Sequence, residues 1–135
     1  MELNKKNIIV TGGASGFGLG IVEKFINNGA KVIIADRNAD LAEQEADKLG
    51  QSAYSINTDV SNLKSIENLK NEAKKIFGQP DIIVNNAGIT HMPDFIENIS
   101  YEEFEKVLNV NVKSVFLMSK AFVPEMKKRK SGVIL

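Results

Sequence analysis

The nine residues Val10–Gly18, VTGGASGFG, decide the fold of this chain. They lead from an apolar run through glycines spaced G-G-x-x-G-x-G into an amphipathic segment. Glycine allows positive φ and lets backbone N–H groups approach phosphate oxygens with no Cβ in between. A helix starting here would add free N–H groups and a positive dipole end. The stretch therefore predicts a nucleotide-binding turn between a strand and a helix, although the literal G-x-G-x-x-G pattern is absent and a purely structural turn is the alternative.

Outside this stretch, short apolar runs alternate with amphipathic segments, which is typical of an α/β fold. The expected strands cover residues 7–11, 31–36, 52–56, 81–84 and 133–135, and the expected helices cover 16–28, 39–49, 63–77 and 100–130. Strands without polar alternation indicate a parallel sheet that is covered on both faces. Right-handed connections then predict an open, doubly wound sheet in one domain, with the ligand crevice at the carboxyl ends of the strands.

Composition excludes several classes of function. The chain has 135 residues, with 17 basic and 17 acidic side chains, so no overall charge attracts nucleic acid or an anionic membrane. It has no cysteine and a single histidine, His91, which leaves no thiolate chemistry and no cysteine or multi-histidine metal site. No apolar stretch has the length of a signal peptide or a membrane span. We therefore expect a cytoplasmic protein without a metal.

Two acidic residues follow expected strands. Asp36 ends the second strand about 20 residues past the glycines, where a carboxylate can accept from both hydroxyls of an adenosine ribose and repel a 2′-phosphate. Arg37 could instead bind that phosphate, but the carboxylate comes first, which favours NAD over NADP. Asp59 could accept from an adenine amino group while Val60 packs on the ring. The alternative for both acids is a strand end or a helix cap, and for Asp59 it has about the same weight as the adenine contact.

Amides follow the fourth strand and recur in the last helix. The segment Asn85–Gly88, NNAG, would suit a turn, a tie between neighbouring strands or a ribose contact. Ser100 and Glu103 form a capping box for a helix to Lys130 that Pro124 could kink. Asn111 lies in a stripe of expected core positions of this helix, which also contains Phe104, Leu108, Val115, Met118 and Phe122. A buried amide needs partners, so we expect Asn111 to be either a satisfied core group or a functional one.

Taken together and in this order, these residues resemble the amino-terminal part of the short-chain dehydrogenase/reductase family, over essentially the whole chain. The resemblance implies a Rossmann-like α/β fold with a doubly wound parallel sheet of order 3-2-1-4-5, truncated at the fifth strand. It implies one NAD(P)-binding domain over residues 1–135 that is incomplete at its carboxyl end. The resemblance implies that the glycine segment holds the NAD(P) pyrophosphate, that the acid after the second strand selects NAD, and that the acid after the third meets adenine. It implies that Asn111 is catalytic, by holding a water in a proton relay. The implied cofactor-binding residues are Gly12, Ser15, Gly16, Phe17, Gly18, Asp36, Arg37, Asp59, Val60, Asn86, Ala87 and Gly88.

Two features depart from the family pattern. Phe17 stands where the family usually has a branched aliphatic residue. The family's catalytic serine follows the fifth strand, and its tyrosine and lysine follow as Y-x-x-x-K. Tyr54 and Tyr101 have no lysine four residues later, so Asn111 is the only one of the four catalytic groups present.

The resemblance implies an NAD(H)-dependent oxidoreductase that interconverts a secondary alcohol and a ketone, similar to 3-oxoacyl-carrier-protein reductases or sugar dehydrogenases. Its partners would be a small-molecule substrate and further copies in a dimer or tetramer. We expect the 135-residue chain alone to be inactive, because it lacks the serine, tyrosine and lysine. The alternative is a noncatalytic nucleotide-binding or assembly module that naturally ends at Leu135.

Overall fold

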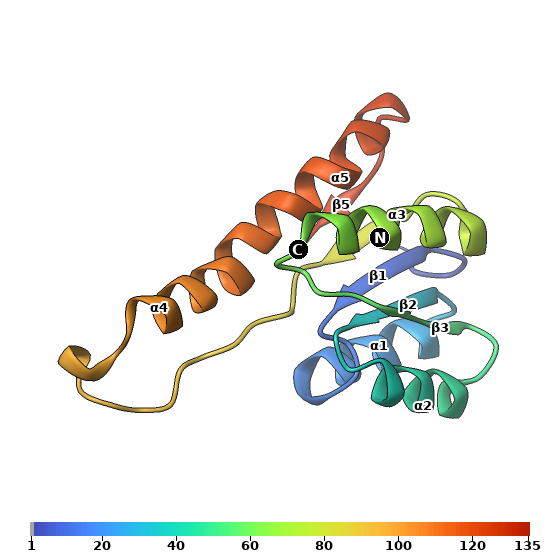
Figure 1. Cartoon of the computed structure of the whole chain (residues 1–135). Helices are drawn as coiled ribbons and strands as arrows, with labels where there is room; N and C mark the ends of the chain where they lie inside the picture. The colour runs from blue at the N-terminus through green and yellow to red at the C-terminus, as the bar shows by residue number, and fades with distance from the viewer. Residues whose placement is uncertain (1) are drawn as a thin grey trace.

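In a computed structural model, which describes residues 2–135, the chain forms one parallel sheet of order β3-β2-β1-β4-β5 (Figure 1). The strands are β1 (Asn7–Thr11), β2 (Lys31–Asp36), β3 (Ala53–Asn57), β4 (Ile82–Val84) and β5 (Val133–Ile134). The helices are α1 (Gly16–Asn27), α2 (Ala39–Leu49), α3 (Leu63–Phe77), α4 (Tyr101–Leu108) and α5 (Ser114–Lys128). The predicted fold class and strand order are confirmed, with element ends displaced by a residue or two.

Two apolar layers cover the sheet, one on each face (Figure 1). Ile8 and Val10 of β1 point to the layer that contains α1 and α2, whereas Ile9 points to the layer of α3 and α5. All three are fully buried, and each contributes about 1.5–3 kcal/mol by leaving water. This explains why the strands read as continuous apolar runs rather than alternating ones.

The helix ends follow the local rules of the sequence. Asn38 caps α2 by accepting from Leu41 N–H, and Asn62 caps α3 by accepting from Ser65 N–H. Gly50 and Gly78 end these two helices with φ values of 84° and 83°. Positive φ of this kind strains a side-chain-bearing residue, which explains glycine at both places.

The last helical region differs from the single helix that we expected. Between α4 and α5 lies a π-helical segment, Asn109–Lys113, which contains Asn111. No residue of α4 or of this segment is buried on any face, because this part of the chain extends away from the sheet (Figure 1). Met118 and Phe122 are buried as expected, but Phe104, Leu108, Asn111 and Val115 are exposed. The prediction of one continuous core stripe is therefore wrong.

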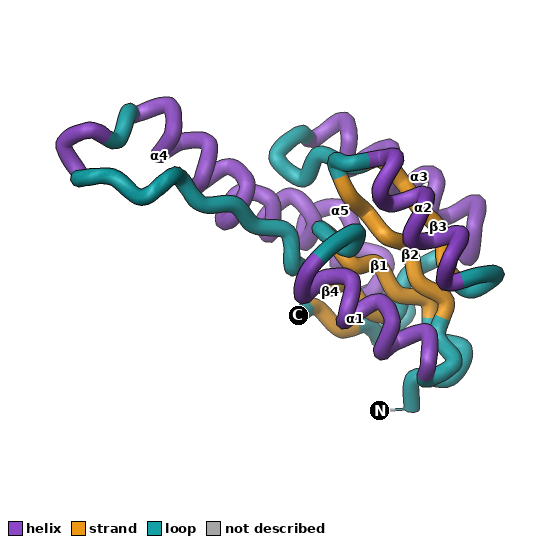
Figure 2. Tube along the Cα trace, turned by 90° about the horizontal axis from the view of Figure 1, so that it is seen from below, coloured by secondary structure: helices purple, strands orange, loops and turns teal. Residues whose placement is uncertain are grey.

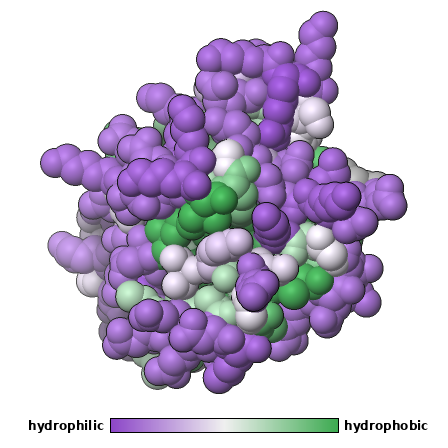
Figure 3. All heavy atoms as spheres, turned by 90° about the vertical axis from the view of Figure 1, so that its right-hand side faces the viewer, coloured by the Kyte–Doolittle hydropathy of each residue, from purple (hydrophilic) through white to green (hydrophobic). Residues whose placement is uncertain are grey.

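The loop that follows β4 extends away from the sheet and its helices, and so does α4, as Figures 1 and 2 show. The large exposed apolar side chains of this extension and of the turn into α5 are Met92, Phe95, Ile96, Tyr101, Phe104, Leu108, Val112, Val115 and Phe116. On the opposite side of the molecule, apolar surface gathers in the middle of the face and hydrophilic side chains surround it (Figure 3). The core thus lies between the five-stranded sheet and the helices α1, α2, α3 and α5, and α4 takes no part in it.

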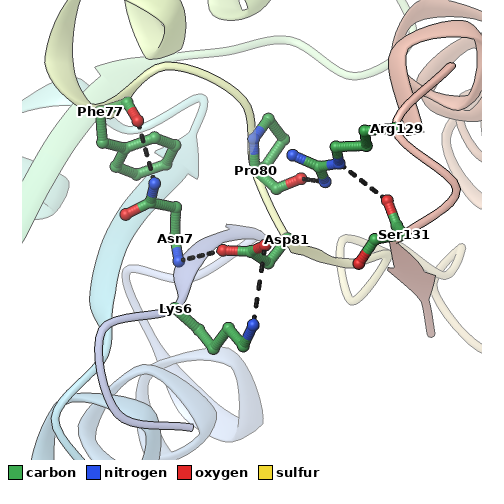
Figure 4. A network of polar contacts seen from close by, with 7 residues as sticks. All are labelled: Lys6, Asn7, Phe77, Pro80, Asp81, Arg129 and Ser131. Carbon is green, nitrogen blue, oxygen red and sulfur yellow. Dashed lines mark hydrogen bonds and ion pairs between the residues drawn. The ribbon is translucent and has the colours of Figure 1, made fainter.

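A polar network joins three connections near one end of the sheet (Figure 4). Asp81 Oδ2 accepts from Asn7 N–H at 3.0 Å, and Asn7 Nδ2 donates to Phe77 O at 2.9 Å. Arg129 donates from Nη2 to Pro80 O and from Nε to Ser131 O. These bonds fasten the starts of β1, β4 and β5 to one another, which fixes the frame on which the opposite strand ends are held.

The predicted capping box of α4 is present. Ser100 N–H and Ser100 Oγ donate to Glu103 Oε2 at 3.1 and 2.9 Å, and Glu103 N–H donates to Ser100 Oγ at 3.1 Å. The main-chain donor and the hydroxyl of Ser100 stabilise the ionised carboxylate, and they hold the pKa of Glu103 below its ordinary value of 4.5.

An NMR titration should therefore place the pKa of Glu103 below 4.5, and Ser100→Ala should raise it. A depressed folded-state pKa contributes stability that is present above the unfolded value and is lost as pH falls through the folded value. The start of α4 should consequently fray only in acid, below pH 4.5. An unchanged pKa of Glu103 in Ser100→Ala would contradict this account of the capping box.

Candidate functional site

Thr11, at the end of β1, joins the glycine loop to the segment after β4. Its Oγ1 donates to Val84 O at 3.2 Å and accepts from Asn86 N–H and Ala87 N–H, both at 3.1 Å. A hydroxyl has one donor and two acceptor positions, so every hydrogen-bonding position of this side chain is used. Thr11 is 2% exposed. Thr11 directly precedes the glycines of the opening stretch, but the sequence predicted no role for it, because a threonine in a buried strand has no distinguishing signal.

Asn86 makes the same connection from the other side. Its Nδ2 donates to Thr11 O and Gly12 O, both at 3.0 Å. Of the three roles considered for the NNAG segment, the tie between neighbouring strands is the one these contacts display. The glycine loop and the β4 turn are therefore held as one unit.

Glycine is required at two points of this unit by close approach. A Cβ on Gly18 would lie 2.0 Å from Gly12 O and 2.6 Å from Asn86 Nδ2. Gly12 has φ of 62°, and a Cβ there would lie 2.9 Å from Ala87 Cα. Gly16 also has positive φ, 54°, but the space beside it is open. Gly12 and Gly18 thus allow a packing that no side chain would permit, while Gly16 serves the turn itself.

Asp36 at the end of β2 reaches back to the glycine loop. Its Oδ2 accepts from Ala14 N–H at 3.1 Å, and its Oδ1 accepts from Asn38 N–H at 3.0 Å. Asp59 differs, because its Oδ1 accepts only from its own turn, from Ser61 N–H at 2.9 Å and Ser61 Oγ at 2.7 Å. The turn interpretation of Asp59 therefore describes its contacts in the chain itself.

Asn111 is exposed, which corrects its expected place in the core. Both polar atoms of its amide nevertheless have partners: Oδ1 accepts from Ile89 N–H and Nδ2 donates to Ile89 O, each at 2.8 Å. The amide thus holds one residue of the post-β4 segment at both of its main-chain groups. Its partners lie in a loop rather than in the core.

These groups surround a cleft of about 660 Å³ at the carboxyl ends of the strands. That volume is within the range of about 300–1,000 Å³ that is usual for small-molecule sites. Of the expected site residues, all line the cleft except Gly16 and Asn111. Those that line it are Gly12, Ser15, Phe17, Gly18, Asp36, Arg37, Asp59, Val60, Asn86, Ala87 and Gly88.

One wall of the cleft was missed by sequence reasoning. It consists of polar and apolar residues of α4 and the π-helical segment, namely Glu102, Glu105, Lys106, Asn109 and Val110. Their spacing of three and four residues was visible in the sequence. A charged stripe of that kind is also what an ordinary solvated helix face looks like, so the spacing alone did not indicate a cleft.

Residues 2–135 contain no group of three or more His, Asp or Glu side chains that could hold a metal ion. None of the helices in the described chain is both long enough and apolar enough to cross a bilayer.

Comparison with known proteins gives consistent matches. The family model for short chain dehydrogenase matches residues 6–135. Galactitol 2-dehydrogenase of Agrobacterium fabrum is 39% identical over 132 residues, which are 98% of this chain and 51% of that protein. The 3alpha-hydroxysteroid dehydrogenase of Mediterraneibacter gnavus is 38% identical over 140 residues, covering 100% and 56% of the two chains.

A solved structure also matches this chain in its fold. The 3-ketoacyl-(acyl-carrier-protein) reductase from Brucella melitensis, complexed with NADH, superposes with a TM-score of 0.93 and 38% identity. The match covers 98% of this chain and 56% of that one. The chain thus spans about half the length of the relatives that it matches.

Proposed function

Because this chain belongs to the short-chain dehydrogenase family, we propose that it is the NAD(H)-binding part of an oxidoreductase that interconverts a secondary alcohol and a ketone. The observation that carries the proposal is the cradle of Gly12 and Gly18, where added Cβ atoms would lie 2.9 Å and 2.0 Å from neighbouring backbone atoms. That close packing brings the start of α1 to the floor of the cleft. A nicotinamide dinucleotide fits this site by its chemistry, because it offers a pyrophosphate to a helix N-terminus and a diol to a carboxylate.

The start of α1 would hold the pyrophosphate. Leu19 N–H is the first in this helix to donate within it, to Ser15 O at 3.1 Å. The preceding N–H groups, those of Gly16, Phe17 and Gly18, have no acceptor within the helix. No acidic residue lies in the first turn, so nothing there opposes an anion.

Asp36 would accept from the adenosine ribose and Asp59 from adenine, with Val60 beside the ring. The Asp36 carboxylate opposes a 2′-phosphate, whereas the adjacent Arg37 could favour it. We therefore propose NAD rather than NADP. The NADH in the Brucella melitensis reductase supports a nicotinamide dinucleotide of either kind.

When bound, the nicotinamide supplies hydride transfer. This chain's own residues bind and orient it, and Asn111 is the catalytic residue that we propose among them. In support, Asn111 holds Ile89, which lines the cleft, through two hydrogen bonds of 2.8 Å. The serine, tyrosine and lysine that the resemblance implies do not occur in this pattern within residues 1–135, so turnover is a property that we propose only for a protein that contains them.

Substrate and assembly belong to the same proposal. The matches with galactitol 2-dehydrogenase and with a 3-ketoacyl-(acyl-carrier-protein) reductase support a small-molecule alcohol or ketone. We also propose that the whole protein is a homo-oligomer. The exposed apolar side chains along α4 and α5 support this, Phe104 and Phe116 among them.

Calorimetric titration with NADH and NADPH tests the proposal. We expect NADH to bind at least about tenfold more tightly, which corresponds to about 1.4 kcal/mol. Asp36→Ala should bring the two affinities together, because it removes both the ribose acceptor and the charge that opposes a 2′-phosphate. Asp40→Ala is the matched control, since Asp40 is an exposed acid of α2 that does not line the cleft. Failure to bind either dinucleotide would refute the site, and tighter binding of NADPH would refute the assignment of Asp36.

A further inference from the structure

The glycine loop is attached to the end of β2 at two points. Gly12 N–H donates to Ala35 O at 2.8 Å, and Ala14 N–H donates to Asp36 Oδ2 at 3.1 Å. The second oxygen of Asp36 accepts from Asn38 N–H at 3.0 Å, which fixes the orientation of the carboxylate. One side chain thus connects the phosphate end of the cleft to the first residues of the β2–α2 turn.

We propose that Asp36 is a positioning residue for the glycine loop, in addition to its part in cofactor choice. This inference rests on the proposed function and extends it. By accepting from Ala14 N–H, the carboxylate occupies that amide and makes it unavailable to an anion. The amides of Gly16, Phe17 and Gly18 at the start of α1 remain available to a phosphate. The loop is preorganised before any ligand arrives, which lowers the ordering cost of binding.

For an anion that has no ribose, the charge of Asp36 and its positioning of the loop change the binding affinity in opposite directions. A carboxylate near the phosphate site repels an anion, so its removal should tighten binding if charge were its only effect. If the carboxylate positions the loop, its removal should weaken binding despite the lost repulsion. Inorganic pyrophosphate separates these effects, because it has no hydroxyl for Asp36 to recognise.

Asp59 provides the matched control. It lines the same cleft and carries the same charge, but its carboxylate accepts only from Ser61. We therefore compare pyrophosphate binding, without added metal, to the unaltered chain, Asp36→Ala and Asp59→Ala. The expected result is binding about two- to tenfold weaker in Asp36→Ala, as for loss of one modest interaction, and unchanged or tighter binding in Asp59→Ala. Tighter binding in both variants would overturn the positioning role.

Amide hydrogen exchange in the ligand-free protein gives an independent measurement. In Asp36→Ala, exchange at Ala14 and Asn38 should be about tenfold faster, because both amides lose their acceptor. In Asp59→Ala, both rates should stay as they are. An unchanged rate at Ala14 in Asp36→Ala would also overturn the proposal. Should that variant not fold, Asp36→Asn keeps one acceptor oxygen, and exchange should then accelerate at one of the two amides only.

The outcome is separable from that of the proposed function. Titration of the unaltered chain with NADH tests the dinucleotide site, whereas the exchange rates need no ligand. Faster exchange together with absent NADH binding would retain Asp36 as a loop-positioning residue and refute the dinucleotide assignment. NADH binding together with unchanged exchange rates would retain the dinucleotide site and refute Asp36 as a loop-positioning residue.

Discussion

Gly18→Ala is expected to abolish dinucleotide binding and to lower the free energy of unfolding by about 3 kcal/mol, at the upper end for overpacking. The added Cβ would lie 2.0 Å from Gly12 O, which is a backbone atom and not the end of a flexible side chain. Gly12 is itself held by Ala35 O and by Asn86 Nδ2. Relief of the clash therefore requires the loop to separate from the β4 turn. NADH titration and urea denaturation measure the two effects.

Gly20→Ala is the control for this substitution. Gly20 lies two residues later in the same helix, is exposed, and has no atom within 4 Å of an added Cβ. A Gly-to-Ala change in a helix interior should stabilise the chain by about 0.5–1 kcal/mol. The two variants should thus move the urea midpoint in opposite directions. Equal behaviour would mean that the close approach at Gly18 does not hold the site together.

Thr11→Val is expected to lower the free energy of unfolding by about 2–4 kcal/mol, because two part-buried main-chain donors lose their acceptor. The exchange preserves the shape of the side chain but removes Oγ1, which accepts from Asn86 N–H and Ala87 N–H. Val84 O loses a donor at the same time. The post-β4 segment should loosen, and NADH affinity should fall with it. Urea denaturation and NADH titration give the two values.

Thr58→Val tests whether this cost is specific. Thr58 is also 2% exposed, but its Oγ1 makes one local bond, to Ile56 O at 3.0 Å. A single lost donor of that kind should cost about 1 kcal/mol or less. If both threonine variants lose the same stability, the cost comes from burying the added methyl group and not from the junction at Thr11.

The layered fold was predictable because each strand repeats the same signal. Ile8, Ile9 and Val10 are apolar in succession since both faces of β1 are covered, and the same holds for Val32, Ile33 and Ile34 in β2. Helix ends were predictable for a related reason, because the residues that begin and end α3, Asn62 and Gly78, act on their immediate neighbours in the sequence. These features depend on a few adjacent residues and need no knowledge of distant contacts.

Features that depend on long-range contacts or on one irregular turn were not predictable. The π-helical segment has no sequence signature in Asn109–Lys113, NVNVK. The apolar stripe that contains Asn111 also did not reveal that α4 and this segment extend away from the sheet and bury no residue. The role of Thr11 was not predicted, because its partners lie at Val84, Asn86 and Ala87, on another strand end. The cleft residues at the strand ends were predictable because topology alone brings such ends together. The cleft wall from α4 was not predictable, because the sequence does not show where this helix lies.

The junction between Thr11 and Asn86 also has a consequence for how the chain folds. The two residues are 75 positions apart, whereas Asp36 and Ala14 are only 22 apart. Closing the longer loop costs more chain entropy, and during synthesis it must wait until β4 has been made. The pairing of β1 with β2 is available much earlier. We therefore expect the glycine loop to meet β2 first and to gain its second wall late, so that the site matures in two kinetic stages.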